Sequence, residues 1–177
     1  MHANKSGQIL PARKQTGIHN VQPRVQPNEL LFRHARSADI PQLQTIENAS
    51  FHVAWDYDDF VRNIHPPQRP CLVVELCGQI VGFMVWDMLP DQIRLMNFAV
   101  LPEFRRRGVG TAMVDKLKGA LDGKHRAVLH LMISEKNLPG QLFWKAVGFR
   151  CTALIPNAFG TMDEDGYLMC YSVLWKY

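Results

Sequence analysis

Apolar positions recur in two different rhythms along the chain, and together they predict a mixed α/β domain. Apolar residues three or four positions apart predict helices, which are expected from about residue 39 to 50, over 56–64, over 111–121 and over 141–147. Short apolar or alternating runs predict strands, which are expected at 31–35, 70–76, 80–89, 93–100, 127–133, 149–155 and 167–175. The turn Cys77-Gly78-Gln79 joins two of these runs, so three consecutive strands form a meander.

The segment from Val100 to Thr111 carries the strongest candidate chemistry, because it joins a predicted strand to a predicted helix. The first turn of a helix has N–H groups without intrahelical partners and binds anions readily. Gly108 and Gly110 allow a ligand to approach the backbone, and three arginines precede them. The segment therefore suits a pyrophosphate, although a tight turn beside a solvated basic face has the same composition.

The glycine spacing in this segment disfavours two familiar nucleotide sites. No lysine follows Gly110, as the ATP-binding G-x-x-x-x-G-K-[ST] loop requires. The third glycine of the dinucleotide-binding G-x-G-x-x-G pattern is also missing.

The charge of the chain is concentrated in its first residues and does not indicate nucleic-acid binding. The 177 residues, 47% of them hydrophobic, suggest one domain with an ordinary core, and their net charge is +4. The four basic residues of 1–28 have no acidic counterpart, and this polar segment predicts a disordered extension over 1–29 before a domain over 30–177. Apolar runs are too short for a membrane span, so we expect a cytoplasmic protein that does not bind membranes.

The four cysteines lie in or beside apolar runs, without the paired spacing or nearby histidines of a metal site. We expect buried free thiols and no bound metal at Cys71, Cys77, Cys151 and Cys170.

The segment 51–60 mixes aromatic residues with carboxylates, and two interpretations compete for it. In the structural one, Trp55 and Phe60 form a hydrophobic staple and the aspartates complement a helix N-terminus. In the functional one, Trp55, Asp56 and Asp58 form an acidic lip that attracts a cationic amine substrate.

Further motifs accompany the arginine–glycine loop. Asn137 precedes an aromatic helix with Phe143-Trp144, and Gly148-Phe149 supplies a strong stop signal. With R-x-x-G-x-G at 105–110, this order resembles the GNAT superfamily of acyl-CoA-dependent N-acetyltransferases over residues 31 to 175. The resemblance implies a largely antiparallel sheet of six to seven strands, splayed between the fourth and fifth, with about four helices.

A branch of this superfamily that acetylates the N-terminal alanine of a ribosomal protein is the most similar in appearance. The likeness depends on Asn97-Phe98-Ala99-Val100, on Ile46-Glu47 and on the run 165–169. The expected reaction is direct attack of a primary amine, on a protein N-terminus or a small molecule, on acetyl-CoA. The resemblance implies that the Val100 backbone N–H stabilises the oxyanion. It also implies a donor site formed by Phe98, Ala99, Val100, Arg105, Arg106, Arg107, Gly108, Val109, Gly110, Thr111, Asn137 and Trp144.

The expected catalytic groups of the superfamily are missing. The glutamate base of the N-terminal branch aligns with Met132, and the usual tyrosine acid aligns with Trp144, whose indole is no useful acid. Arg94 replaces a glutamate that other branches carry on the fourth strand. His130 shares a strand face with Met132 and is the best remaining candidate, ahead of Ser134. Two tyrosines could replace the acid, although packing on the sheet accounts for them equally well: Tyr167 and Tyr171.

Two functions agree with this set of residues. An α-amine, with a reference pKa of about 8, costs only about 1.4 kcal/mol to deprotonate at pH 7, against about 4.6 kcal/mol for lysine. An acetyltransferase without a strong base would therefore favour an N-terminal amine. The alternative is an acyl-CoA-binding module of the same fold that acts as a sensor or interaction domain without turnover. Either would be a monomer or a homodimer.

Overall fold

The sheet and helices of the computed structural model follow the predicted order, and the model describes residues 23–64, 67–160 and 163–175. The helices of this part of the chain are α1 (Ile40–Asn48), α2 (Tyr57–Ile64), α3 (Val109–Lys118) and α4 (Leu138–Ala146). The strands are β1 (Leu30–His34), β2 (Cys71–Leu76), β3 (Gln79–Met88), β4 (Gln92–Val100), β5 (Val128–Ser134), β6 (Arg150–Ile155) and β7 (Gly166–Ser172).

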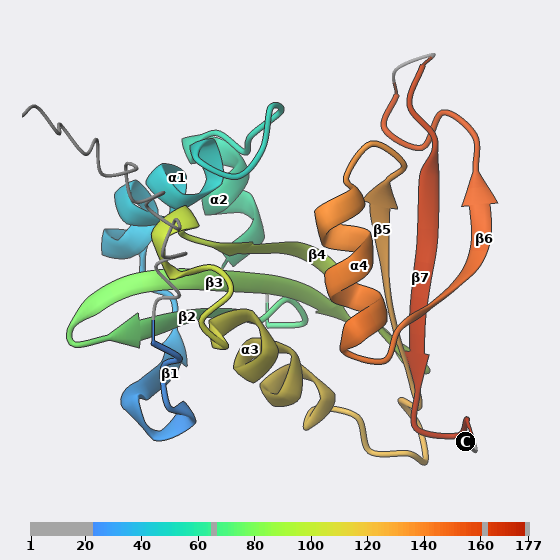
Figure 1. Cartoon of the computed structure of the whole chain (residues 1–177), viewed down its shortest axis with the longest axis horizontal. Helices are drawn as coiled ribbons and strands as arrows, with labels where there is room; N and C mark the ends of the chain where they lie inside the picture. The colour runs from blue at the N-terminus through green and yellow to red at the C-terminus, as the bar shows by residue number, and fades with distance from the viewer. Residues whose placement is uncertain (1–22, 65–66, 161–162, 176–177) are drawn as a thin grey trace, which may run out of the picture.

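One seven-stranded sheet with the order β1-β2-β3-β4-β5-β7-β6 confirms the predicted mixed architecture. All neighbouring strands are antiparallel except β4 and β5, which are parallel. These two pair only at three positions, and the last pair joins Arg94 to His130. Beyond it the strands separate, and Figure 1 shows β5 and β7 standing at a steep angle to the end of β4. This is the predicted splay.

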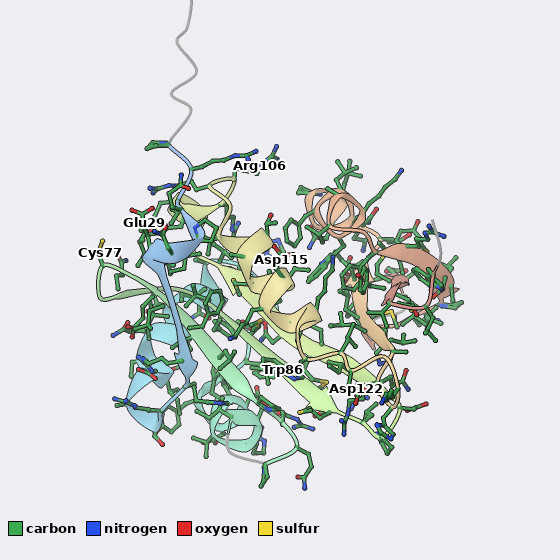
Figure 2. All side chains as sticks on the ribbon, turned by 90° about the horizontal axis from the view of Figure 1, so that it is seen from below. Glu29, Cys77, Trp86, Arg106, Asp115 and Asp122 are labelled. Atoms are coloured by element: carbon green, nitrogen blue, oxygen red, sulfur yellow. The ribbon has the colours of Figure 1, made fainter. Side chains whose placement is uncertain are left out.

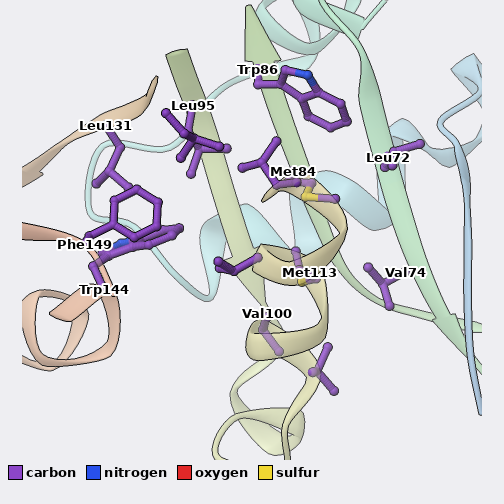
Figure 3. Packing of buried hydrophobic residues seen from close by; sticks show 14 of the residues in the cluster. Leu72, Val74, Met84, Trp86, Leu95, Val100, Met113, Leu131, Trp144 and Phe149 are labelled. Carbon is purple, nitrogen blue, oxygen red and sulfur yellow. The ribbon is translucent and has the colours of Figure 1, made fainter. Parts of the chain in front are cut away.

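Two hydrophobic layers cover the two faces of the sheet. On one face α3 and α4 pack over β3, β4 and β5, with Met113 and Trp144 among the buried side chains (Figures 1 and 3). On the other face α1 and α2 bury Leu43 and Phe60 against β2 and β3. Each helix contributes one apolar stripe, as the spacing of its residues predicts. No helix in the described ranges has both the length and the apolar character to cross a membrane.

The ends of α3 differ from the prediction at both termini. The helix begins at Val109 instead of Thr111, because Gly108 adopts a φ of 95° and ends the preceding turn. It stops at Lys118 with Gly119 as its cap, three residues before the predicted end at residue 121. The predicted stop of α4 is confirmed, since Gly148 has a φ of 95° and the Phe149 N–H donates to the Trp144 carbonyl.

The extension predicted over 1–29 lies mostly outside the described residues. Its last seven residues pack on the domain: Pro27–Glu29 form a short 3-10 turn, and Val25 is buried. The Val25 N–H donates to the Arg107 carbonyl at 2.9 Å. This short segment, residues 23–29, therefore lies against the arginine–glycine loop.

The prediction that the cysteines are buried is correct for only one of them. All four are free thiols, but Cys77 and Cys151 are exposed and Cys170 is half-buried. Cys77 occupies the tip of the β2–β3 hairpin, and Cys151 lies on the edge strand β6, where apolar sequence does not guarantee cover. Burial raises the pKa of the Cys71 thiol to about 12, which makes it a poor nucleophile.

Candidate active site

The end of β4 presents a free backbone N–H to the gap between β4 and β5. The Leu101 N–H donates to the Val81 carbonyl of β3 at 2.9 Å. Successive backbone groups along a strand point in opposite directions, so the Val100 N–H points away from β3. Because β5 does not pair there, that N–H faces the open side of the splay. A ligand lying in this gap would meet an available backbone donor.

The loop after β4 forms the second part of the site. Arg106 and Gly108 both adopt left-handed conformations, with φ of 61° and 95°, and this geometry turns the chain sharply into α3. The Ala112 N–H is the first to bond back into the helix, at 3.0 Å from the Gly108 carbonyl. The preceding N–H groups, those of residues 109 to 111, are therefore available to an anion, and the helix dipole favours negative charge at this end.

The three arginines of the loop have different surroundings. The Arg105 guanidinium donates to the Val100 carbonyl and to the Ser50 hydroxyl, both at 2.8 Å, so it links β4 to the α1–α2 loop. Arg107 donates to the Pro23 carbonyl at 3.1 Å and lies over the Phe104 ring. Within the described ranges, Arg106 makes no hydrogen bond, ion pair or ring contact, and Figure 2 shows it on the same end of the molecule as Glu29. Arg106 is thus the loop arginine best placed to meet a phosphate.

An aromatic cluster lines the gap on the α3–α4 face. Trp144 is only 5% exposed and packs edge to face on Phe98 and Phe143, with ring centroids 5.0 and 5.1 Å apart. A Cβ at Gly110 would lie 3.2 Å from the Phe143 ring, so the close approach of the start of α3 to this ring favours glycine at position 110. The structure thus places Trp144 in the core beside the gap, where its main role is packing.

Asn137 lies at the start of α4, where its side chain caps the helix. Its Oδ1 accepts a hydrogen bond from the Gly140 N–H at 3.0 Å. The exposed side-chain amide group remains able to donate to a ligand. Tyr167 and Tyr171 also pack on the α3–α4 face of the sheet. They are on the opposite face from His130, which favours the packing role for both.

His130 lies where β4 and β5 separate. It is paired with Arg94 on one side and with Cys170 of β7 on the other. Leu129 and Leu131 point into the α3–α4 core, so His130 and Met132 point to the α1–α2 face. The His130 Nε2 is buried and has no hydrogen-bond partner among the described residues. Burial lowers the pKa of His130, and Arg94 lowers it further.

Glu47 is a buried carboxylate under the α1–α2 loop and is 1% exposed. Its carboxylate accepts from the Asn97 amide and from the Trp55 N–H at 3.0 Å. Burial raises the pKa of Glu47, while these two hydrogen bonds oppose that rise. We identified Glu47 only as part of a branch motif, but its spacing of four from Leu43 places it on the buried face of α1, and that was the available signal.

The aspartates at the start of α2 largely have the structural role. The Asp59 N–H donates to the Asp56 carboxylate at 2.7 Å, and the Asp56 N–H donates back to Asp59 at 3.0 Å. Trp55 packs edge to face on Phe60 at 5.6 Å, which completes the predicted staple. Asp58 is exposed and remains the candidate for an acidic lip. Across the described part of the chain, no group of three or more His, Cys, Asp or Glu residues could hold a metal ion.

Comparisons with known proteins agree with this geometry. Residues 40–149 match the model of the acetyltransferase (GNAT) family. The chain is 26% identical over 154 residues to an N-alpha-acetyltransferase of Sulfurisphaera tokodaii, which covers 80% of this chain and 92% of that protein. The crystal structure of the ribosomal-protein-S18-alanine N-acetyltransferase from Escherichia coli superimposes with a TM-score of 0.73 at 22% identity, covering 84% of this chain and 96% of the other. Arabidopsis thaliana NAA60 in complex with acetyl-CoA gives 0.70 at 16% identity, covering 81% and 98%.

Proposed function

Because the chain belongs to the acetyltransferase (GNAT) family, we propose that it transfers an acetyl group from acetyl-CoA directly to the α-amine of a protein or peptide. The observation that carries the proposal is the gap between β4 and β5, bordered by the free Val100 N–H and by His130. A relative named N-alpha-acetyltransferase supports the same class of acceptor.

The donor would lie along β4 and reach the start of α3. Backbone groups of Phe98 to Val100 are expected to align its pantetheine arm, and Asn137 to donate to it. The N–H groups after Gly108 and the Arg106 guanidinium suit its pyrophosphate. The Val100 N–H would stabilise the negative charge that develops on the thioester oxygen during attack.

The acceptor would enter from the α1–α2 face, where His130 and Met132 point. His130 has the only titratable side chain on this face of β5, and its buried, unpartnered Nε2 can accept a proton. We assign it as the general base that removes a proton from the attacking amine. Because burial keeps the imidazole neutral, it is ready to act at neutral pH.

The base is weak, and this limits the acceptors. Deprotonating an α-amine at pH 7 costs about 1.4 kcal/mol, against about 4.6 kcal/mol for a lysine side chain. A histidine with a lowered pKa offers little help against the larger cost. The proposed acceptor is therefore an N-terminal amine.

A steady-state assay of thiol release tests the proposal. Purified protein is incubated with acetyl-CoA and matched peptides, one with a free N-terminus and no lysine, the other with a blocked N-terminus and one lysine. We expect release with the first peptide and little with the second. Faster release with the lysine peptide would contradict the acceptor class. Stabilisation by acetyl-CoA without turnover of any amine up to about pH 9 would instead indicate an acyl-CoA-binding module.

A further inference from the structure

We propose that Arg94, held in place by Asp87, is a positioning residue that keeps His130 in the neutral form needed to accept a proton. The inference deepens the proposed function and rests on the assignment of His130 as base. It starts from the last paired position of β4 and β5, where Arg94 and His130 lie side by side.

The Arg94 guanidinium is held against the neighbouring strand. Its Nη2 and Nε both donate to Oδ2 of Asp87 on β3, at 2.5 and 3.2 Å. Asp87 is opposite Arg94 in the β3–β4 register, so backbone pairing and side-chain contacts agree. Arg94 is half-exposed, yet these two bonds restrict where its charge can lie.

The single negative charge of Asp87 does not cancel the charge of Arg94, because Asp87 accepts hydrogen bonds from two arginines. Its other oxygen, Oδ1, accepts from Arg69 at 2.5 Å, and Arg69 also bonds to Asn63. Burial opposes ionisation of Asp87, but hydrogen bonds from Arg69 and Arg94 outweigh it and lower its pKa. One carboxylate and two guanidinium groups leave this cluster with a net positive charge, and Arg94 is the member of the cluster that is paired with His130.

The other groups around His130 offset this charge only in part. On β7 its partner is Cys170, which contacts the Thr152 hydroxyl at 3.3 Å. Beyond Cys170 the same row reaches Arg150 of β6, whose guanidinium lies over the Trp175 ring. Asp91, in the β3–β4 turn, is the one acid that acts on His130, and it raises the pKa of the imidazole.

The balance of these groups favours a neutral imidazole. Burial is the largest influence on the pKa of His130 and lowers it, and the positive charge of Arg94 lowers it again. Since a base must be unprotonated to accept a proton, Arg94 extends the working range of His130 toward lower pH.

The test compares Arg94→Met with Arg94→Lys, which keeps the cation, and with the matched control Arg150→Met, which removes a cation two strands further along the row. The His130 imidazole is titrated by NMR in the ligand-free protein and assigned with His130→Asn. We expect its midpoint to move to higher pH in Arg94→Met only. The acid limb of kcat/KM should move in the same direction, so activity near pH 6 falls several-fold while activity at pH 8.5 is nearly retained.

Arg94→Gln gives the same comparison if Arg94→Met fails to fold, because its neutral side-chain amide can still donate to Asp87 while the cation is removed. An unchanged His130 midpoint in both variants would overturn the proposal. A raised midpoint with an unmoved acid limb would also overturn it, because the base would then be another group. Absence of turnover in the wild-type protein would overturn the proposed function separately, since the NMR titration does not depend on it.

Discussion

The carboxylate of Glu47 and the amide of Asn97 join α1 to β4 beneath the acceptor side of the site. The Asn97 Nδ2 lies 3.1 Å from one Glu47 oxygen and 3.0 Å from the other, and both side chains are buried. Glu47 also accepts the Trp55 N–H, so the α1–α2 loop is held at the same point. This carboxylate therefore holds the loop against β4, in addition to the link that Arg105 makes between Ser50 and Val100.

Removing that carboxylate should loosen the loop. We expect Glu47→Ala to lower the free energy of unfolding by about 2 kcal/mol, because the Asn97 amide and the Trp55 N–H lose a buried acceptor. The KM for a peptide acceptor should rise, while the affinity for acetyl-CoA changes little. Urea unfolding and steady-state kinetics measure both effects, with exposed Glu103→Ala as the control. An acceptor KM equal to that of the wild type would show that the loop does not need this anchor.

The raised pKa of Glu47 also predicts a pH dependence of stability. Its pKa is higher in the folded chain than the ordinary value of 4.5, so the folded state binds the proton more tightly. The stabilisation that Glu47 contributes is then fully present below pH 4.5 and is lost as pH rises through the folded pKa. As pH rises through the folded pKa of Glu47, the free energy of unfolding of Glu47→Gln should therefore increase relative to that of the wild type. Urea unfolding at a series of pH values above 4.5 measures the difference, and a difference that stays constant with pH would contradict the expectation.

Periodicity and turn chemistry predicted most of the fold, because each helix buries one stripe and each strand alternates or is wholly apolar. The splay was expected only through the family resemblance, since nothing local in β4 or β5 encodes how far two strands stay paired. The partners of Arg105 and Arg107 could not be predicted, because they lie at Ser50 and Pro23, far along the sequence. Likewise, the exposure of Cys151 depends on β6 being an edge strand, which is a property of the whole sheet.

The two roles of the α1–α2 aspartates can be separated by matched substitutions. Asp56→Ala should cost about 1 kcal/mol of stability, because the Asp59 N–H loses its capping acceptor. Asp58→Asn should leave stability within about 0.5 kcal/mol of the wild type, as expected for an exposed position. If Asp58 forms part of an acidic lip, the same change should raise the acceptor KM, most clearly at low salt. Equal kinetics for Asp58→Asn and the wild type would show that Asp58 does not form an acidic lip that attracts the acceptor.

Substitutions of the two glycines, Gly108 and Gly110, should weaken donor binding for different reasons. Gly108→Val forces a β-branched residue into a φ of 95°, so we expect donor affinity to fall at least about tenfold, or ~1.4 kcal/mol. Gly110→Ala has no such strain, but its Cβ would come within 3.2 Å of Phe143. Gly110→Ala/Phe143→Leu should therefore recover affinity that Gly110→Ala loses. Calorimetric titration with acetyl-CoA measures the affinity of all three variants. If the double variant recovers no affinity, the loss in Gly110→Ala does not arise from the contact with Phe143.

The segment 23–29 should act on donor binding through the backbone of the loop. Val25 is buried, donates its N–H to the Arg107 carbonyl, and places its own carbonyl 3.7 Å from the site of a Cβ at Gly108. Val25→Asp would bury a charge and detach the segment. We expect the KM for acetyl-CoA to rise at least about threefold, or ~0.65 kcal/mol, with kcat nearly unchanged. Leu31→Asp, an acid at a position that is already 58% exposed, is the matched control.

Arg107→Met distinguishes this route from direct phosphate binding. The substitution removes the Nε–H donor to the Pro23 carbonyl but keeps the backbone carbonyl that Val25 uses. If the segment supports the loop, Val25→Asp and Arg107→Met should each weaken the binding of acetyl-CoA. The double variant Val25→Asp/Arg107→Met should then bind it little worse than Val25→Asp alone. If Arg107 instead contacts a phosphate, only Arg107→Met should weaken the binding of acetyl-CoA, and the size of this effect should depend strongly on salt concentration. A donor KM unaffected by either change would show that neither the segment nor the arginine contributes to the site.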